Sequence, residues 1–389
     1  MRLAIITTHP IQYYAPIFKL LHERGNIRIM VFYTWGESSQ KKHDPGFGKT
    51  IEWDVPLLEG YPYRWVRNTA GRPGSQRFNG IVTPDLCDLI ENWHADAILV
   101  FGWAWNGHLK AMRHFKGKVP VLFRGDSTLL NSQFSWKNLC KSFFLKWVYR
   151  HVDTALYVGS NNKAYFKRYG LKDDQLIFAP HAIDNNRFAS DRSNEAFKLR
   201  AALVQEASDI LVLYAGKFEM VKNVSLLVSA FIRLGKPNVH LLLLGNGKQE
   251  NELKELAKDH TNVHFIDFQN QSVMPNIYQA CDLLCLPSTS ETWGMVINEA
   301  MACGKAILAS DRVGCAADLV INQSNGFIFE NGNLKDLQEK LNILTSSRKQ
   351  LIRMGNNSLS MISSWSFENI VQTIENIFSQ LEAEGDLHR

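Results

Sequence analysis

The stretch SETWGMVINEAMACG at residues 290–304 contains two glutamates, Glu291 and Glu299, which are separated by seven mostly apolar residues. Glu299 falls inside a helical pattern of apolar residues, where a carboxylate without a hydrogen-bonding partner would be costly to bury. The two hydroxyl groups of a ribose would supply the donors that it needs. A lysine or a helix N-terminus of the same domain would satisfy the carboxylate equally well, so the residues alone leave both alternatives open.

The residues before Glu299 indicate a binding site for an anion. The apolar run CDLLCLPS at 281–288 leads into TSET and then into the helical pattern, which places Ser290 and Glu291 at a helix N-terminus. The unpaired N–H groups and the dipole of such a terminus attract phosphate, and Gly294 removes a side chain that would obstruct close approach. A phosphate-bearing ligand is therefore expected here.

The elements around this stretch alternate in a β-α-β rhythm. Short apolar runs alternate with longer helical patterns, which predicts parallel sheets that are covered by helices on both faces. The rhythm starts again near residue 208, after the aperiodic, turn-rich stretch APHAIDNNRF at 179–188. We therefore expect an α/β protein with two Rossmann-like domains, in which ligands bind beyond the carboxyl ends of the strands. The expected strands lie at 2–9, 27–35, 96–102, 119–125 and 154–160 in the first series, and at 209–216, 239–245, 263–268, 281–288 and 305–310 in the second.

Domain boundaries follow from this pattern. The first domain is expected at 1–185 and the second at 186–365, and a last helical pattern at 366–389 either ends the second domain or crosses back onto the first. A chain of 389 residues with 45% apolar residues is long enough for two cores of ordinary size. Residues 1–190 hold 25 Lys and Arg against 15 Asp and Glu, whereas the remainder hold 18 against 23. The two halves are therefore expected to meet different partners.

Residues 287–320, PSTSETWGMVINEAMACGKAILASDRVGCAADLV, resemble the donor-binding segment of the retaining glycosyltransferases of family 4, the glycosyl transferases group 1. Upstream, LYAGKFEMVKNVSLLVSAF at 213–231 resembles the strand and the Gly-Arg segment of that family, with a lysine a few residues later. The runs LLLLGNGKQENELKEL and VHFIDFQNQSVMPNIYQACDLLCLPS follow in the family's order. The resemblance covers residues 155–330, and the N-terminal half is similar only in its rhythm. It implies the GT-B architecture, two Rossmann-like domains that face each other across a cleft.

The resemblance implies a role for each matching residue. Glu299 would bind the ribose of the nucleotide, Glu291 a hydroxyl of the donor sugar, and Lys217 and Lys222 the diphosphate. Charge grows on the leaving nucleoside diphosphate as the glycosidic bond breaks, and two ammonium groups with a helix dipole can stabilise it. The expected catalytic set is Glu291, Lys217 and Lys222 together with Asp126, which lies outside the matching residues. The expected donor-binding set is Gly216, Glu299, Trp293, Gly294, Met295 and Phe268.

The sequence departs from the family pattern at some of these positions. Lys217 stands where an arginine is usual, and a lysine is a point charge without the bidentate fork of a guanidinium. Trp293 stands where a smaller aromatic residue is common. Trp293 and Cys315 are therefore expected to reshape the sugar pocket.

No metal and no cofactor is expected beside the nucleoside-diphosphate sugar. No Asp-x-Asp motif ends an apolar strand, so the two lysines take the place of a metal ion in the implied mechanism. The six cysteines form no CxxC pair and have no histidine at metal-ligand spacing, which favours free thiols in a reducing compartment.

Two stretches of the first domain carry candidate contacts to the acceptor or to the donor sugar. THPIQYYAP follows the first strand and offers Gln12 and Tyr13 to the acceptor and His9 to the sugar; a capping or core role for His9 is the alternative. RGDS follows the strand VPVLF, with Arg124 as a phosphate contact and Asp126 as an acceptor of a proton or of a sugar hydroxyl. No nucleophile is assigned, because the departing phosphate oxygen can take the acceptor's proton on the same face.

The acceptor is expected to be a glycan or a lipid-linked glycan. The segment KNLCKSFFLKWVYRH at 137–151 mixes basic and aromatic residues, so it either lies on an anionic inner membrane surface or forms a core helix with snorkelling lysines. The start has no secretory signal and no run could span a bilayer, so a cytoplasmic protein is expected, either free or peripheral at the inner face of the membrane. Nucleic acid would also suit the basic half, but no recognition motif supports it.

Two other classes of protein share parts of this pattern. A nicotinamide-dependent dehydrogenase would have the same rhythm, but GNGKQE and THPIQY lack the dinucleotide fingerprint. A catalytically inactive relative that binds a sugar nucleotide is the other alternative. The prediction is a retaining, metal-independent transferase that moves a sugar from a UDP- or GDP-sugar to a hydroxyl of a glycan, in the assembly of a cell-surface polysaccharide.

Overall fold

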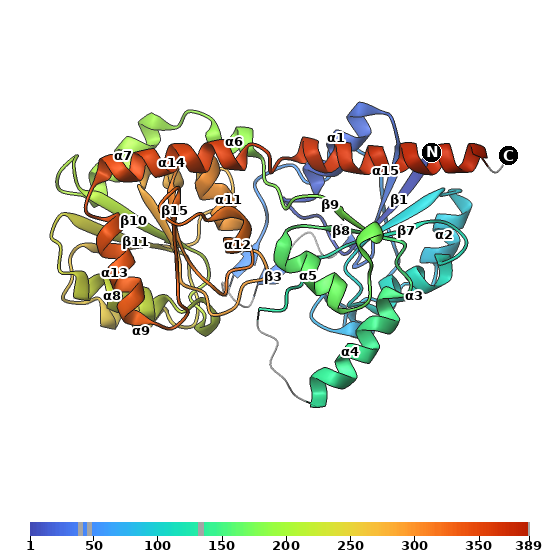
Figure 1. Ribbon diagram of the computed structural model, residues 1–389, viewed down its shortest axis with the longest axis horizontal. Helices are drawn as coiled ribbons and strands as arrows, with labels where there is room; N and C mark the ends of the chain where they lie inside the picture. Colours follow the sequence, from blue (N-terminus) through green and yellow to red (C-terminus); the bar gives the residue numbers. More distant parts are fainter. Residues whose placement is uncertain (38–41, 45–48, 131–135, 388–389) are drawn as a thin grey trace. The chain divides into compact units, whose positions relative to one another are not determined.

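The computed structural model describes residues 1–37, 42–44, 49–130 and 136–387 of the chain (Figure 1). The chain divides into two compact units. Unit 1 comprises Met1–Lys42, Pro56–Pro180 and Phe367–Arg389, and unit 2 comprises His43–Val55 and His181–Ser366.

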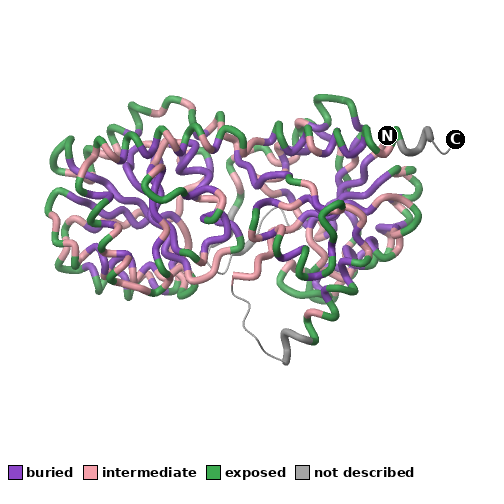
Figure 2. Tube along the Cα trace, in the orientation of Figure 1, coloured by how far each residue is buried: buried purple, intermediate pink, exposed green. Residues whose placement is uncertain are grey.

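Unit 1 is built on a seven-stranded sheet in the order β5-β2-β1-β6-β7-β8-β9, in which neighbouring strands are parallel. Its central strands are buried along nearly their whole length, as expected where helices cover both faces (Figure 2). The strands are β1 (Arg2–Thr7), β2 (Arg28–Tyr33), β5 (Tyr63–Trp65), β6 (Ala97–Phe101), β7 (Val121–Arg124), β8 (Thr154–Tyr157) and β9 (Leu176–Phe178). The helices are α1 (Ala15–Arg24), η2 (Phe78–Gly80), α2 (Leu86–Asn92), α3 (Asn106–Phe115), α4 (Trp136–Tyr149), α5 (Ser160–Arg168), η3 (Asp173–Gln175) and α15 (Phe367–Leu387).

The last helix, α15, packs on unit 1 beside α1 (Figure 1). Glu375 of α15 accepts a hydrogen bond from Asn26 Nδ2 at 2.9 Å and pairs with Arg24 Nη2 at 2.9 Å. The Thr373 hydroxyl donates to the carbonyl of Phe178, at the end of β9, at 3.2 Å. The helical pattern that ends the sequence therefore belongs to the same unit as the first strand.

Unit 2 is built on a six-stranded sheet in the order β12-β11-β10-β13-β14-β15, again with parallel neighbours. The strands are β10 (Ile210–Ala215), β11 (Val239–Leu244), β12 (Val263–Ile266), β13 (Leu283–Leu286), β14 (Ala306–Ser310) and β15 (Gly326–Phe329). The helices are α6 (Asn185–Ala189), α7 (Ser193–Leu203), η4 (Met220–Lys222), α8 (Val224–Leu234), α9 (Glu250–Leu256), α10 (Met274–Ala280), α11 (Met295–Ala302), α12 (Ala316–Leu319), α13 (Leu334–Leu344) and α14 (Arg348–Ile362). The α/β class and the two Rossmann-like domains expected from the sequence are confirmed.

Unit 2 also takes a short segment from the first part of the chain. β3 (Lys42–Asp44) and β4 (Lys49–Ile51) form a separate two-stranded sheet, and residues 43–55 group with unit 2. The Asn270 amide donates to the carbonyl of Glu52 at 2.8 Å, and the Ser272 N–H donates to the carboxylate of Asp54 at 3.2 Å. No periodicity in the sequence indicates this excursion, because the contacts join residues 218 positions apart.

Candidate active site

The carboxyl ends of parallel strands bring the candidate donor-binding residues to one edge of the unit 2 sheet. Gly216 follows β10 and donates its N–H to the carbonyl of Leu244 at 3.0 Å. Phe268 lies just beyond β12 and donates its N–H to Asn246 Oδ1 at 2.8 Å. The loops after β10 and β11 are in close contact, because a Cβ atom at Gly245 would lie 2.0 Å from the Gly216 carbonyl oxygen.

Gly294 is the N-cap residue immediately before helix α11, and its backbone has a conformation that favours glycine. Its φ is 101°, and an added Cβ would lie 3.0 Å from Val313 Cγ1 and 3.1 Å from Leu286 Cδ2. Met295 is the first residue of the helix, and the Ile297 N–H already donates to the Gly294 carbonyl at 2.9 Å. The sequence-based expectation of a helix N-terminus beside Glu291 is therefore met, with the helix beginning at Met295.

The loop that carries Glu291 is fixed by backbone hydrogen bonds. The Glu291 N–H donates to the carbonyl of Arg312 at 3.1 Å, and its own carbonyl accepts from the Gly314 N–H at 3.0 Å. The Cys315 N–H donates to the carbonyl of Trp293 at 3.0 Å. The side chain of Glu291 therefore extends from a loop whose backbone is held in place, and its contact with a donor sugar stays a prediction.

Lys222 and Glu291 are brought together across 69 positions of the chain. Lys222 ends η4, and its Nζ is in direct contact with a carboxylate oxygen of Glu291, to which the Ser288 hydroxyl also donates at 3.4 Å. Both side chains are only about one-fifth exposed, at 21% and 19%. The carbonyl of Lys217, five residues before Lys222, accepts a hydrogen bond from the buried Tyr214 hydroxyl at 2.7 Å. This edge of the sheet therefore holds a mostly buried lysine paired with a carboxylate, and the carboxylate belongs to the loop that leads into α11.

Glu299 is buried inside α11, as the apolar pattern around it predicts. Its side chain is 2% exposed and accepts a hydrogen bond from the Tyr278 hydroxyl of α10 at 2.7 Å. A carboxylate has four lone-pair sites, so it can accept more than one hydrogen bond. Neither of the alternatives drawn from the sequence included Tyr278, and the ribose contact stays a prediction.

Trp293 packs inside unit 2. Its side chain is 3% exposed, its indole N–H donates to Asn298 Oδ1 at 2.9 Å, and its ring lies 5.3 Å from the ring of Trp365. The Asn298 amide donates in turn to the carbonyl of His181 at 2.9 Å. Cys315 is also fully buried, and burial raises the pKa of its thiol. Both side chains are therefore part of the interior of unit 2, and their effect on the sugar pocket stays a prediction. The role of Asn298 was missed because its partner lies 117 positions away.

The candidate residues of the first domain lie in unit 1, after the carboxyl ends of β1 and β7. His9 follows β1, bonds through Nδ1 to the Thr8 hydroxyl at 2.8 Å, and meets the ring of Trp35 edge-on at 5.2 Å. Gln12 and Tyr13 occupy the following turn and are half-buried. The contacts of these three residues with an acceptor or a donor sugar stay predictions.

Arg124 ends β7 and has a fully internal set of partners. It is 2% exposed, and its two Nη groups donate to the carbonyls of Ala179 and Pro180 at 2.9 and 2.7 Å. Burial lowers the pKa of Arg124 to about 10, although the nearby Tyr14 and Asp126 favour its charged form. The guanidinium therefore joins the end of β7 to Ala179 and Pro180, the last residues of the 56–180 segment. The half-buried carboxylate of Asp126 lies near it.

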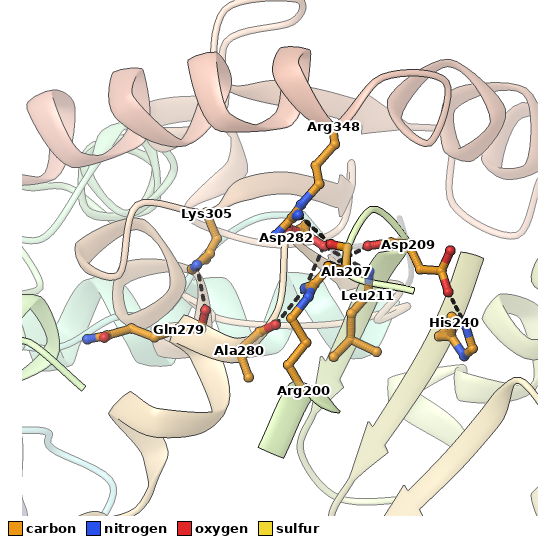
Figure 3. Close-up of polar contacts among 10 residues, drawn as sticks. All are labelled: Arg200, Ala207, Asp209, Leu211, His240, Gln279, Ala280, Asp282, Lys305 and Arg348. Atoms are coloured by element: carbon orange, nitrogen blue, oxygen red, sulfur yellow. Dashed lines mark hydrogen bonds and ion pairs between the residues drawn. The ribbon is translucent and has the colours of Figure 1, made fainter. Parts of the chain in front are cut away.

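The opposite, amino-terminal edge of the unit 2 sheet holds another set of charges (Figure 3). Asp282, just before β13, accepts from Arg200 Nη1 at 2.9 Å, from Arg348 Nε at 3.1 Å and from the Leu211 N–H at 2.9 Å. Lys305, just before β14, donates to the carbonyl of Gln279 at 3.0 Å. These charges join the helices to the strand starts, which identifies them as structural and separates them from the candidate site.

The described residues contain neither a metal-binding cluster nor a membrane-spanning helix. They hold no group of three or more His, Cys, Asp or Glu side chains that could ligate a metal ion. Within the same residues, no helix is long and apolar enough to cross a membrane. Independence from metal stays a prediction, because it concerns the reaction.

Comparisons with known proteins agree with this geometry. Residues 196–361 match the family model of the glycosyl transferases group 1. An uncharacterized glycosyltransferase of Methanocaldococcus jannaschii is 24% identical over 68% of this chain and 84% of its own length. The N,N'-diacetylbacillosaminyl-diphospho-undecaprenol alpha-1,3-N-acetylgalactosaminyltransferase of Campylobacter jejuni is 25% identical over 58% of this chain and 57% of its own length. The crystal structure of Anabaena HepE in complex with UDP and glucose superposes with a TM-score of 0.72 at 20% identity, over 98% of this chain and all of that one.

Two parallel sheets with alternating helices, together with that superposition, define the GT-B fold of glycosyltransferases. The second unit carries the residues that match the glycosyl transferases group 1. The family resemblance drawn from the sequence is confirmed.

Proposed function

We propose that this protein is a retaining, metal-independent glycosyltransferase that moves a sugar from a UDP- or GDP-sugar to a hydroxyl of a glycan or lipid-linked glycan. The observation that carries the proposal is the contact of Lys222 with Glu291 beside the N-terminus of α11, the helix that also carries Glu299. In this arrangement a cation, a helix dipole and two carboxylates are available to a diphosphate, a sugar and a ribose.

The leaving diphosphate is where the protein contributes most to the rate. As the bond between the anomeric carbon and the phosphate oxygen breaks, its electron pair stays on the oxygen and negative charge grows there. Lys217, Lys222 and the N-terminus of α11 stabilise that charge more strongly in the transition state than in the bound donor. The donor must also engage Lys222, which is paired with Glu291 in this structure.

The acceptor hydroxyl forms the new bond to the anomeric carbon on the face that the diphosphate leaves, so the anomeric configuration is retained. Its proton moves to the departing phosphate oxygen or to Asp126. Glu291 holds one hydroxyl of the donor sugar, which positions the reacting carbon between the leaving group and the acceptor. No side chain is assigned as a covalent nucleophile.

The acceptor and the cellular setting rest on the relatives and on charge. The Campylobacter relative is named for a diphospho-undecaprenol acceptor, and HepE was crystallised with UDP and glucose. The name of the Campylobacter relative supports a lipid-linked acceptor for this chain. The HepE complex supports a UDP-sugar as its donor. We place the protein in the cytoplasm, peripheral at the inner face of the cell membrane, in the assembly of a cell-surface polysaccharide.

The proposal is tested in two steps. The full chain is first screened by thermal shift against free nucleotides and against UDP- and GDP-sugars, because a ligand at about 100 times its Kd stabilises a fold by about 2.7 kcal/mol. The donor that binds is then incubated with diphospho-polyprenol-linked glycans, and the product is analysed by mass spectrometry and by NMR of the new anomeric centre. An inverted centre would refute retention, and a chain that binds a sugar nucleotide without transfer or hydrolysis would be the inactive alternative.

A further inference from the structure

The outward side of α4 carries large apolar side chains. Phe143, Phe144 and Trp147 are 67%, 42% and 36% exposed, whereas Leu145 and Val148 of the same helix are fully buried. A surface helix of a globular protein normally turns polar residues outward. Single exposed apolar residues are ordinary, but three neighbouring aromatic rings on one helix indicate a surface that meets an apolar partner.

This aromatic surface continues into a cavity between α3 and α4. The ring of Phe144 lies 5.6 Å from the ring of Trp103 and 5.7 Å from that of Trp147, so the three rings are contiguous. The cavity has a volume of about 810 Å³. Its walls include Trp103, Leu109, Phe144 and Trp147, with Lys110 and Arg113 at the same opening.

Basic residues outnumber acidic ones in the stretch of chain that contains these rings. Between Asp96 and Asp153 the chain has nine Lys and Arg residues, and Asp126 is its only acid. Lys141, Lys146 and Arg150 are exposed, and none of them has a carboxylate partner among the residues that the structure describes. Within the described part of the chain, the charges of these three side chains are therefore not neutralised and remain available to an anionic partner.

We propose that this surface docks on a bilayer of anionic phospholipids. The aromatic side chains enter the boundary between headgroups and acyl chains, where amphipathic rings are favoured, and the basic side chains contact lipid phosphates. We call it the docking face, formed by Lys141, Phe143, Phe144, Lys146, Trp147 and Arg150. The combination of aromatic rings with unpaired cations favours a membrane over a protein partner, whose acidic patch would not also match three exposed rings.

The inference deepens the peripheral position proposed above, and its biological purpose rests on the proposed function. The inference itself can be tested without donor or acceptor. The full chain is sedimented with vesicles of phosphatidylglycerol and phosphatidylcholine in equal parts, and separately with phosphatidylcholine alone. Binding is expected only to the mixed vesicles, and it should fall as salt rises, because the Debye length shrinks from about 10 Å at 0.1 M to about 3 Å at 1 M.

Two variants separate the apolar from the electrostatic contribution. Phe143→Ser should weaken the vesicle partition by about tenfold, because it removes a ring that would leave water on docking. Lys141→Ala together with Lys146→Ala should weaken it by about 25-fold, at about fivefold for each charge. All six substituted positions, the controls below included, are exposed, so the thermal unfolding midpoint should not change.

Matched controls come from unit 2. Phe197→Ser removes a ring that is 70% exposed on α7, and Lys198→Ala with Lys349→Ala removes the same charge from that unit. Both should bind mixed vesicles like the wild type. Equal binding to both kinds of vesicle, or unchanged binding by Phe143→Ser, would overturn the proposal. A wild-type dimer that Phe143→Ser converts to a monomer, without vesicle binding by either, would show that a second copy of the chain covers the face.

The two proposals can fail separately. A chain that sediments with anionic vesicles but transfers no sugar would retain the docking face and refute the proposed function. A chain that transfers sugar to a detergent-solubilised acceptor but ignores anionic vesicles would keep the function and refute the docking face.

Discussion

The hydroxyl of Tyr278 donates a hydrogen bond to a carboxylate oxygen of Glu299 at 2.7 Å, and both side chains are buried in unit 2. This contact explains how a helix with an apolar pattern can hold an acid, since a buried carboxylate needs donors. It also makes the proposed ribose contact testable apart from the stability of the helix, because each partner can be changed alone.

Glu299→Gln should weaken the binding of the free nucleoside diphosphate by about 10- to 100-fold, since hydrogen bonds to charged groups contribute about 1.5–3 kcal/mol. The amide is a poorer acceptor for the ribose hydroxyls and adds a donor where none is needed. Isothermal titration calorimetry measures the change. Tyr278→Phe is the matched control, because it keeps the carboxylate and should lower stability more than affinity. Wild-type affinity in Glu299→Gln would remove the ribose assignment.

Glu291→Gln should reduce kcat more than it changes nucleotide affinity, because the proposed partner of Glu291 is the donor sugar. The variant also loses the charge that pairs with Lys222, so the lysine is released for the diphosphate. Affinity for the free nucleoside diphosphate should therefore be equal or higher. The two quantities are measured by steady-state kinetics and by calorimetry, and an unchanged kcat with the intact donor would refute the role.

Arg124→Met should destabilise unit 1 by about 2–5 kcal/mol, because it leaves the buried carbonyls of Ala179 and Pro180 without donors. Urea denaturation followed by tryptophan fluorescence reports on this unit, which holds seven of the ten tryptophans. Arg67→Met is the control: Arg67 pairs with Asp85 at the surface, where such pairs contribute about 0–1 kcal/mol. Similar losses in the two variants would contradict the structural role of Arg124.

The hydrogen-bond partners of Arg124 could not be predicted from the sequence. A basic residue at the end of a strand indicates a ligand contact in a Rossmann-like domain, and the sequence contains nothing that pairs it with carbonyls 55 and 56 positions later. The same holds for Asn298 with His181 and for residues 43–55 in unit 2, since all three depend on how distant segments pack.

Local patterns were more informative. Ten of the thirteen strands in the two large sheets could be predicted, because apolar periodicity is a local signal, whereas the short strands β5, β9 and β15 were not expected. The helix after Glu291 was also expected, but it begins at Met295, two residues later than the helical pattern. The family resemblance implied that Lys222 and Glu291 bind parts of the same donor, whereas their direct contact required the structure.

Unit 1 should lose stability as the pH falls from about 6.5 to about 4. Burial lowers the pKa of His108 to about 4, and its ring bonds to the Thr34 hydroxyl and the Gly102 carbonyl at 2.8 Å each. Between these pH values the unfolded chain binds a proton at His108 that the folded chain does not. Lowering the pH therefore stabilises the unfolded state relative to the folded state. The loss should reach about 3 kcal/mol and level off below pH 4, where both states are protonated.

His108→Asn isolates this contribution, because asparagine can still donate to Gly102 but does not titrate in this range. The difference in urea midpoint between pH 7 and pH 4.5 should be smaller in the variant than in the wild type. His22→Asn changes an exposed histidine of α1 and should leave the pH dependence as it is. An identical pH dependence in His108→Asn would show that other groups control acid stability.

Lys217→Ala and Lys222→Ala should each reduce kcat by more than they raise the donor KM. An interaction that strengthens toward the transition state affects turnover, whereas one that is equal before and during bond breaking affects only KM. The loss of one such contact should cost roughly 2–4 kcal/mol, by analogy with removal of an oxyanion donor. Lys222→Ala also leaves the carboxylate of Glu291 without its cation, so its effect should exceed that of Lys217→Ala.

Steady-state kinetics in EDTA measures both variants, with Lys198→Ala as a surface control. Wild-type turnover in either variant would remove that lysine from the mechanism, and a wild-type enzyme that loses activity in EDTA would refute independence from metal.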